Sequence, residues 1–127
     1  MSDTPMERFF ATYAERYMAS DADAVADMYE APLLAVRDGT AIHLGDHDAV
    51  RSHLASLMDA YRNAGAKRAT IAALNSTQLG RSSMLATVRW NVQSEDGTVL
   101  RDFTTSYHML RQEPGGWQIL SYTNHDD

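Results

Sequence analysis

The chain of 127 residues contains no cysteine. Disulfide bonds, thiolate metal sites and a cysteine nucleophile are therefore excluded. Basic residues are also scarce, with 11 Lys and Arg against 17 Asp and Glu, which gives a net charge of −6. Because Lys67 and Arg68 form the only adjacent basic pair, little is available to neutralise a phosphate backbone, and nucleic acid is not expected as a partner.

Long apolar runs are missing as well. No stretch approaches the roughly 20 residues needed to cross a bilayer, so no membrane association is expected. The opening residues, MSDTPMERFF, lack the basic start and apolar run of a secretory signal, which favours a cytoplasmic protein. There is no glycine-rich phosphate loop, and GRSSM at 80–84 lacks the spacing of a serine nucleophile. Nucleotide binding and acyl-enzyme chemistry are therefore not expected.

The remaining composition is that of an ordinary globular protein, with 44% hydrophobic and 22% charged residues. The length suits a single domain over residues 1–127. Thr4, Pro5 and Glu7 stand in the order of a capping box with proline at the first helical position. A first helix is therefore predicted over about 5–19.

A second, short helix is predicted to begin after Ser20 or Asp21, with Pro32 marking its end. Asp38 and Gly39 then stand between two short apolar runs, and this pair suits the positive backbone angles of a tight turn. The two runs are therefore predicted to form a hairpin.

Asp46 is a suitable cap for a long third helix that ends near Gly65. Alternating patterns beyond it predict strands at about 67–79, 82–95, 98–112 and 117–124. The order of helix, helix, hairpin, helix and antiparallel meander predicts an α+β fold with helices packed on one face of the sheet.

A two-residue turn at Asp96 and Gly97 would pair Glu95 with Thr98 and fix the register of its hairpin. Counting outward gives one largely apolar face, made of the pairs Trp90 with Phe103, Val88 with Thr105, Ala86 with Tyr107, and Met84 with Met109. The opposite face is polar, made of the pairs Asn91 with Asp102, Arg89 with Thr104, Thr87 with Ser106, and Leu85 with His108. We therefore expect the polar row to point away from the core.

The outer row is not expected to be an active site, because Asp102 and His108 lie six strand residues, or roughly 20 Å, apart. The segment EPGGW at 113–117 predicts a third turn, with Gln112 opposite Trp117. That register places Tyr122 beside Tyr107 and Leu120 beside Met109.

This arrangement resembles the NTF2-like, or SnoaL-like, superfamily of cone-shaped α+β domains. The resemblance rests on the paired N-terminal helices, on MYEAPLLAVRDGTAIHLGDHDAVRSHL and on the closing YHMLRQEPGGWQILSYTNH. It implies a curved antiparallel sheet wrapped around three helices, which together form a conical pocket. It also implies homodimerisation through the outer sheet face, here at Arg89, Thr104, Ser106 and His108.

The superfamily includes ketosteroid isomerases, polyketide cyclases, dehydratases, epoxide hydrolases and members without known catalysis, so fold decides little about function. Isomerase-like members place a carboxylate base near the first strand pair, where this chain has Arg37. Phe103 faces inward where an acidic donor would stand. A steroid isomerase is therefore not favoured.

The leading hypothesis is a pocket that binds a small hydrophobic or aromatic molecule without a cofactor or metal. The residues expected to line it are mostly aromatic and inward-facing: Tyr13, Tyr17, Tyr29, Met58, Trp90, Phe103, Tyr107 and Tyr122. Each tyrosine has an alternative interpretation as a core aromatic whose hydroxyl is bonded to backbone.

Two other functions remain open. The first is a cofactor-free isomerase, cyclase or dehydratase that uses Tyr29, His43 or Tyr107 as acid or base. The second is a non-catalytic dimeric module that holds a partner on its outer face. His47 and His53 lie six apart on the third helix and share no face, so they do not predict a helical zinc site.

Overall fold

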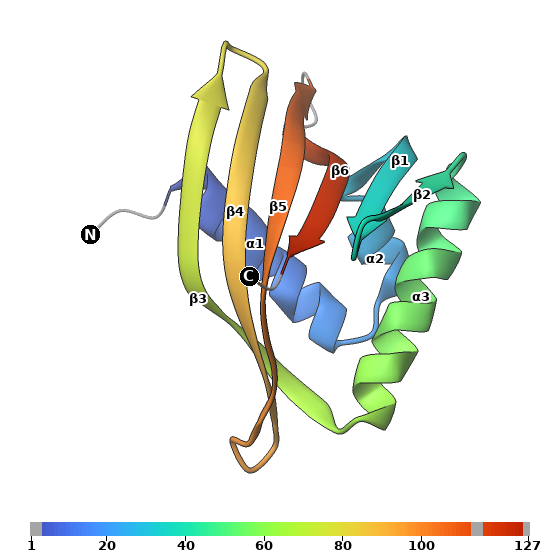
Figure 1. Cartoon of the computed structure of the whole chain (residues 1–127), viewed down its shortest axis with the longest axis vertical. Helices are drawn as coiled ribbons and strands as arrows, with labels where there is room; N and C mark the ends of the chain where they lie inside the picture. The colour runs from blue at the N-terminus through green and yellow to red at the C-terminus, as the bar shows by residue number, and fades with distance from the viewer. Residues whose placement is uncertain (1–3, 113–115, 126–127) are drawn as a thin grey trace.

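A computed structural model describes residues 4–112 and 116–125. Over these residues three helices lie against one face of a curved, unclosed six-stranded sheet with the order β2-β1-β6-β5-β4-β3 (Figure 1). The helices are α1 (Pro5–Met18), α2 (Ala22–Ala26) and α3 (His47–Asn63). The strands are β1 (Tyr29–Arg37), β2 (Thr40–Leu44), β3 (Ala66–Leu79), β4 (Ser83–Ser94), β5 (Val99–Gln112) and β6 (Gly116–His125). The predicted α+β class is confirmed.

The first helix begins as its sequence predicts. Thr4 Oγ1 accepts a hydrogen bond from the Glu7 amide at 3.1 Å, and Glu7 Oε1 accepts one from the Thr4 amide at 2.8 Å. This reciprocal capping box satisfies two amides that the first helical turn would otherwise leave open. The helix then buries one face, formed by Met6, Phe10, Tyr13 and Ala14.

The second helix is shorter than predicted. Asp21 caps it, but it ends at Ala26, and Pro32 lies inside β1 after a cis peptide bond. Tyr29 already belongs to β1, where it pairs with Ile119 of β6, and the Ile119 amide donates to the Met28 carbonyl at 2.9 Å. Pairing with a neighbouring strand has therefore replaced the last predicted turn of helix.

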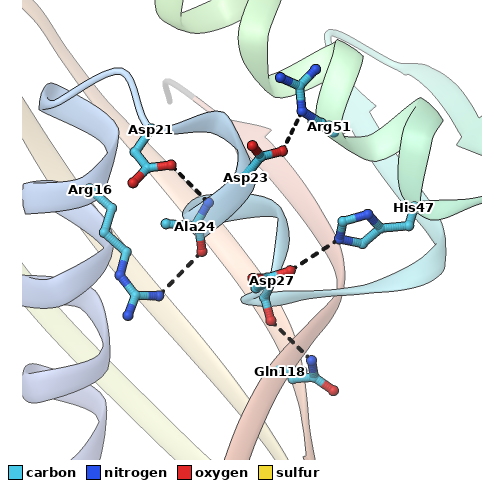
Figure 2. A network of polar contacts seen from close by, with 8 residues as sticks. All are labelled: Arg16, Asp21, Asp23, Ala24, Asp27, His47, Arg51 and Gln118. Atoms are coloured by element: carbon cyan, nitrogen blue, oxygen red, sulfur yellow. Dashed lines mark hydrogen bonds and ion pairs between the residues drawn. The ribbon is translucent and has the colours of Figure 1, made fainter.

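Polar contacts hold α2 and the residue after it against three neighbouring elements (Figure 2). His47 Nε2 lies 3.3 Å from Asp27 Oδ1, and Gln118 Nε2 donates to the Asp27 carbonyl at 3.1 Å. The remaining contacts run from Arg16 on α1 to the Ala24 carbonyl and from Arg51 on α3 to Asp23. Because the charged pairs are exposed to solvent, each contributes little to the free energy of folding. Their main effect is on the orientation of α2.

The register between β4 and β5 agrees with the counted one over its main length. Trp90 pairs with Phe103, Ala86 with Tyr107 and Met84 with Met109, as predicted. The two-residue turn predicted at Asp96 and Gly97 is wrong. Gln93 pairs with Val99, which leaves Leu100 as an extra residue in β5. The Ser94 amide donates to the Thr98 carbonyl at 2.9 Å, so a longer loop closes the hairpin. The bulge absorbs the offset, and the inner and outer faces stay as counted.

The predicted register between β5 and β6 agrees with the structure at one end only. Tyr107 pairs with Tyr122 as predicted, but Met109 pairs with Ile119 rather than Leu120. Gln112 pairs with Gly116 rather than Trp117. An irregularity between the two halves moves Ile119 into the core, where it is fully buried. The third turn was predicted at 113–117, and residues 113–115 of it lie outside the described residues.

The two-residue turn predicted at Asp38 and Gly39 is present, and Arg37 pairs with Thr40 across it. Both turn residues have positive φ, +52° at Asp38 and +75° at Gly39, as this turn requires. No helix among the described residues is long and apolar enough to span a bilayer.

The central contact of the core is Phe10. Its ring lies 4.7 Å from that of Tyr107 and 6.2 Å from that of Trp90, and its side chain is fully buried. The helix layer and the inner face of the sheet therefore meet at this residue.

We expect Phe10→Ala to lower the free energy of unfolding by about 3–5 kcal/mol, because it removes a buried ring and leaves a cavity. Phe9→Ala is the matched control, since Phe9 is only half-buried, and its effect should be clearly smaller. Urea denaturation of both variants measures the difference. Equal losses would show that Phe10 is not the central contact.

Candidate functional site

A cavity opens between α1, α3 and the inner face of the sheet. The volume of the cavity is about 70 Å³. On the same scale a single water needs about 10–15 Å³, so the cavity is larger than one that holds a single water. Its walls are mainly apolar and aromatic.

The structure brings together seven of the eight residues predicted to line a pocket: Tyr13, Tyr17, Tyr29, Trp90, Phe103, Tyr107 and Tyr122. Met58 is not among the lining residues. It is buried on α3 and borders a second hollow beside Lys67. The helical stripe identified Met58 as inward-facing, but it did not show which side of α3 faces the cavity.

His43 does not belong to this site. It lies exposed on β2, a short strand at the edge of the sheet, and it does not line the cavity. Its neighbour Ile42 is itself 43% exposed. An edge strand of five residues has no buried face that could direct the imidazole inward.

Hydroxyl groups at the cavity wall bond to other side chains rather than to backbone. The Tyr13 and Tyr29 hydroxyls are 2.7 Å apart, and Trp90 Nε1 donates to the Tyr107 hydroxyl at 2.9 Å. Because the indole nitrogen can only donate, the Tyr107 hydroxyl accepts this bond, and the side chains of Tyr13 and Thr105 also hydrogen-bond to it. These hydroxyl groups therefore form one connected cluster at the wall.

Burial raises the pKa of Tyr29 and of Tyr107 well above the ordinary value, because a phenolate would be desolvated. Both tyrosines therefore remain protonated near neutral pH. They act as hydrogen-bond donors, and neither is a base at that pH. The catalytic role predicted for these two residues is thereby limited to donating a hydrogen bond or a proton.

One ionisable pair at the cavity was missed by the sequence reasoning. His53 Nε2 on α3 lies 2.7 Å from the Tyr122 hydroxyl on β6. Burial lowers the pKa of His53 below 6.5, with Arg37 adding to the effect, and burial raises the pKa of Tyr122 to about 12. Both groups are therefore neutral near pH 7. The available signal was that His53 lies three residues after Val50 and four before Leu57, at the edge of the apolar stripe.

Two arginines line one end of the cavity. Arg101 Nη1 donates to the Tyr61 hydroxyl at 2.7 Å, and the guanidinium lies 4.0 Å from the centre of the Phe103 ring. Arg37 ends β1 and pairs with Asn124 of β6. Continuing the alternation by two residues, from Phe103 to Arg101 and from Ala35 to Arg37, would have identified both.

No Asp or Glu of the described chain lines this cavity. Within residues 4–112 and 116–125, no three His, Asp or Glu side chains gather in a way that could hold a metal ion. The wall offers aromatic surface, hydroxyl groups and guanidinium groups, and the His53 imidazole contacts it from behind through Tyr122. Such a wall can bind an apolar body and donate hydrogen bonds to its acceptors.

The polar row lies on the outer face of the sheet and forms its own contacts. Arg89 donates two hydrogen bonds to Asp102, at 2.9 Å and 3.1 Å. The Ser106 hydroxyl lies 2.9 Å from both the Thr87 hydroxyl and His125 Nε2. Association of two copies through this face stays a prediction.

We expect the pKa of His53, measured by NMR titration, to lie below 6.5. The unfolded chain then binds a proton at this residue before the folded chain does, so stability falls as pH drops below 6.5. His53→Gln should lose less stability than the wild type between about pH 7.5 and about pH 5. His43→Gln is the exposed control and should behave as the wild type. A His53 midpoint at or above 6.5 would contradict the neutral pair described above.

Comparison with solved structures finds the same fold at low sequence identity. Aln2 from a Streptomyces species superposes with a TM-score of 0.75 and 18% identity, covering 100% of this chain and 95% of that one. ActVI-ORFA from Streptomyces coelicolor gives a TM-score of 0.75 and 13% identity over 94% and 90% of the two chains. An NTF2-like protein with a cystatin-like fold from Novosphingobium aromaticivorans gives 0.74 and 17% over 94% and 77%. At these identities the likeness concerns the fold alone.

Comparison with functionally curated proteins gives no match. The family model described as NTF2-like protein (DUF6841) matches residues 2–127. This match spans both the cavity and the outer face, and it confirms the superfamily that the sequence resembles. The chain therefore belongs to the NTF2-like proteins of the DUF6841 family.

Proposed function

We propose that this protein binds a small hydrophobic or aromatic molecule in the cavity between its helices and its sheet. The carrying observation is the continuous aromatic wall of the cavity. Tyr13 stacks on Tyr17 and on Trp90, with ring centres 5.6 Å and 5.9 Å apart. Planar rings of this kind favour a planar apolar ligand, which gains contact area and ring stacking when it enters.

The hydroxyl donors suit a ligand with at least one acceptor oxygen. A ligand oxygen would accept a hydrogen bond from this cluster in place of one of its internal bonds. An apolar body with one or two oxygens, such as a phenol or an enone, suits such a wall, whereas a purely aliphatic ligand would gain no hydrogen bond there.

Binding is favoured over catalysis because the tyrosines at the wall are held protonated by burial. His53 and Tyr122 form a further pair suited to proton transfer, with rings 6.3 Å apart and nearly parallel. An isomerase, cyclase or dehydratase would use Tyr29 or Tyr107 only as an acid, and His43 does not line the cavity.

Calorimetric titration with a steroid, a polycyclic phenol and a fatty acid tests the proposal. We expect at least one of the first two to bind with one molecule per chain. Ala69→Phe should weaken that binding tenfold or more, because Ala69 lines the cavity and the new ring would fill it.

The matched control for this experiment is Ala41→Phe. Ala41 is exposed on β2 and does not line the cavity, so the added ring leaves the space unchanged. Binding by this variant should equal that of the wild type. Absence of binding for every compound, or equal binding by both variants, would reject the proposal.

We also propose that two copies associate through the outer face of β4 and β5. The helices cover only the inner face (Figure 1). The outer face presents polar side chains around Leu85, which is 43% exposed. The paired charges of Arg89 and Asp102 offer a self-complementary surface of the kind a twofold dimer needs.

Replacing both Arg89 and His108 with glutamate should convert the dimer to a monomer in sedimentation velocity, because like charges would then face each other across the twofold axis. Thermal unfolding should remain cooperative, since neither side chain belongs to the core. Arg81→Glu in the loop between β3 and β4 is the charge-reversal control outside this face and should leave the dimer intact. An unchanged sedimentation coefficient for the double variant would exclude this interface.

A further inference from the structure

The two arginines at the cavity lie at the same end of the sheet. Side chains alternate along a strand, so Arg101, Phe103 and Thr105 share the inner face of β5. Thr105 pairs with Asn124, and Asn124 pairs with Arg37, so these three residues form one row across β5, β6 and β1. Arg101 stands four residues further along β5, beyond Phe103. Both guanidinium groups therefore line the end of the cavity that lies away from Tyr29.

Neither arginine forms an ion pair with a carboxylate of the described residues. The salt bridges of the basic residues Arg51, Arg62 and Arg89 go to Asp23, Asp59 and Asp102, none of which lines the cavity. Arg101 instead bonds to the Tyr61 hydroxyl and stacks on Phe103. Over residues 4–112 and 116–125, neither Arg101 nor Arg37 has a carboxylate counterion.

The formal charge of the cavity opposes that of the chain. Two arginines and no described carboxylate give the wall a charge of +2, whereas the whole chain carries −6. A protein with this net charge repels anions at long range, so an anion would be held only where cations are gathered locally. Guanidinium groups bind carboxylates through paired hydrogen bonds of fixed geometry.

We propose that the natural ligand carries an acidic group, a carboxylate or an equivalent oxyanion, which Arg37 and Arg101 bind while its aromatic or apolar body lies against Tyr13 and Trp90. This inference rests on the proposed function, because the same cavity holds the body of the ligand. It narrows that function to aromatic and apolar acids.

The test uses two probes of equal shape, 2-naphthoate and 2-naphthamide, titrated into the intact chain by calorimetry. They share one ring system and differ in charge near neutral pH. We expect naphthoate to bind about tenfold more tightly than naphthamide, because hydrogen bonds to a charged group are the stronger ones. Its affinity should also fall as salt is added, whereas the affinity for naphthamide should not.

Single substitutions test which residues cause the preference for naphthoate. Arg37→Gln and Arg101→Gln should each reduce the preference for naphthoate over naphthamide about tenfold, because the loss falls mainly on the charged probe. Arg81→Gln is the matched control, because Arg81 is exposed and does not line the cavity, and its preference should equal that of the wild type. Retention of the preference in both cavity variants would overturn the assignment.

The outcomes separate this inference from the function on which it rests. Equal affinity for the two probes overturns the acidic ligand and leaves the binding function standing. Failure of both probes also overturns it, and the titrations with a steroid, a phenol and a fatty acid then decide whether the cavity binds anything.

Discussion

The register between β4 and β5 determines which side chains reach the cavity. Side chains alternate between the two faces of a sheet, so one paired position, Trp90 with Phe103, assigns every other residue of the hairpin. A shift of β5 by one residue against β4 would turn Asp102 inward and move Phe103 and Tyr107 to the outer face. The extra residue Leu100 lies beyond this region, near the end of the hairpin, and therefore leaves the cavity unchanged.

The polar atoms of the aromatic wall form hydrogen bonds with neighbouring side chains rather than across the cavity. Among the described residues no buried side-chain nitrogen or oxygen lacks a hydrogen-bond partner. The bonds from Trp90 to Tyr107 and from His53 to Tyr122 run along the wall and connect neighbouring elements. Burial of these groups is therefore compatible with an unfilled centre, since none of them has to reach across it for a partner.

Sequence alone predicted the elements and the faces of the sheet well, because both follow from local periodicity and turn chemistry. Thr4 and Glu7 marked the first helix, and the pairing of Trp90 with Phe103 followed from counting. The prediction from sequence was wrong where a contact between residues distant in the chain overrode the local preference. Pairing with β6 drew Tyr29 out of the predicted helix, and an irregularity in β6 replaced Leu120 by Ile119. No local signal encodes either event.

The candidate site was predicted as an aromatic wall without its polar end. Tyrosines and tryptophan at inward positions were recognisable by alternation, whereas the bond between His53 and Tyr122 joins residues 69 positions apart. Met58 was predicted to line the cavity and does not, because a helical stripe shows which residues face inward but not which residues they contact. Arg101 and Arg37 continued patterns already in use, but arginine at the end of a strand is normally solvated, so its inward position became evident only in the folded chain.

Arg101 and Arg37 differ in how freely their side chains move. The bond to Tyr61 and the stacking on Phe103 hold the guanidinium of Arg101 in one orientation before anything enters the cavity. Arg37 is exposed at the end of β1, where a long side chain keeps most of its rotamer freedom. Fixing such a side chain costs about 0.5–1.5 kcal/mol of conformational entropy on binding, a cost that folding has already met for Arg101. Arg101 thus provides a preorganised anchor, and Arg37 a flexible contact able to adapt to ligands of different length.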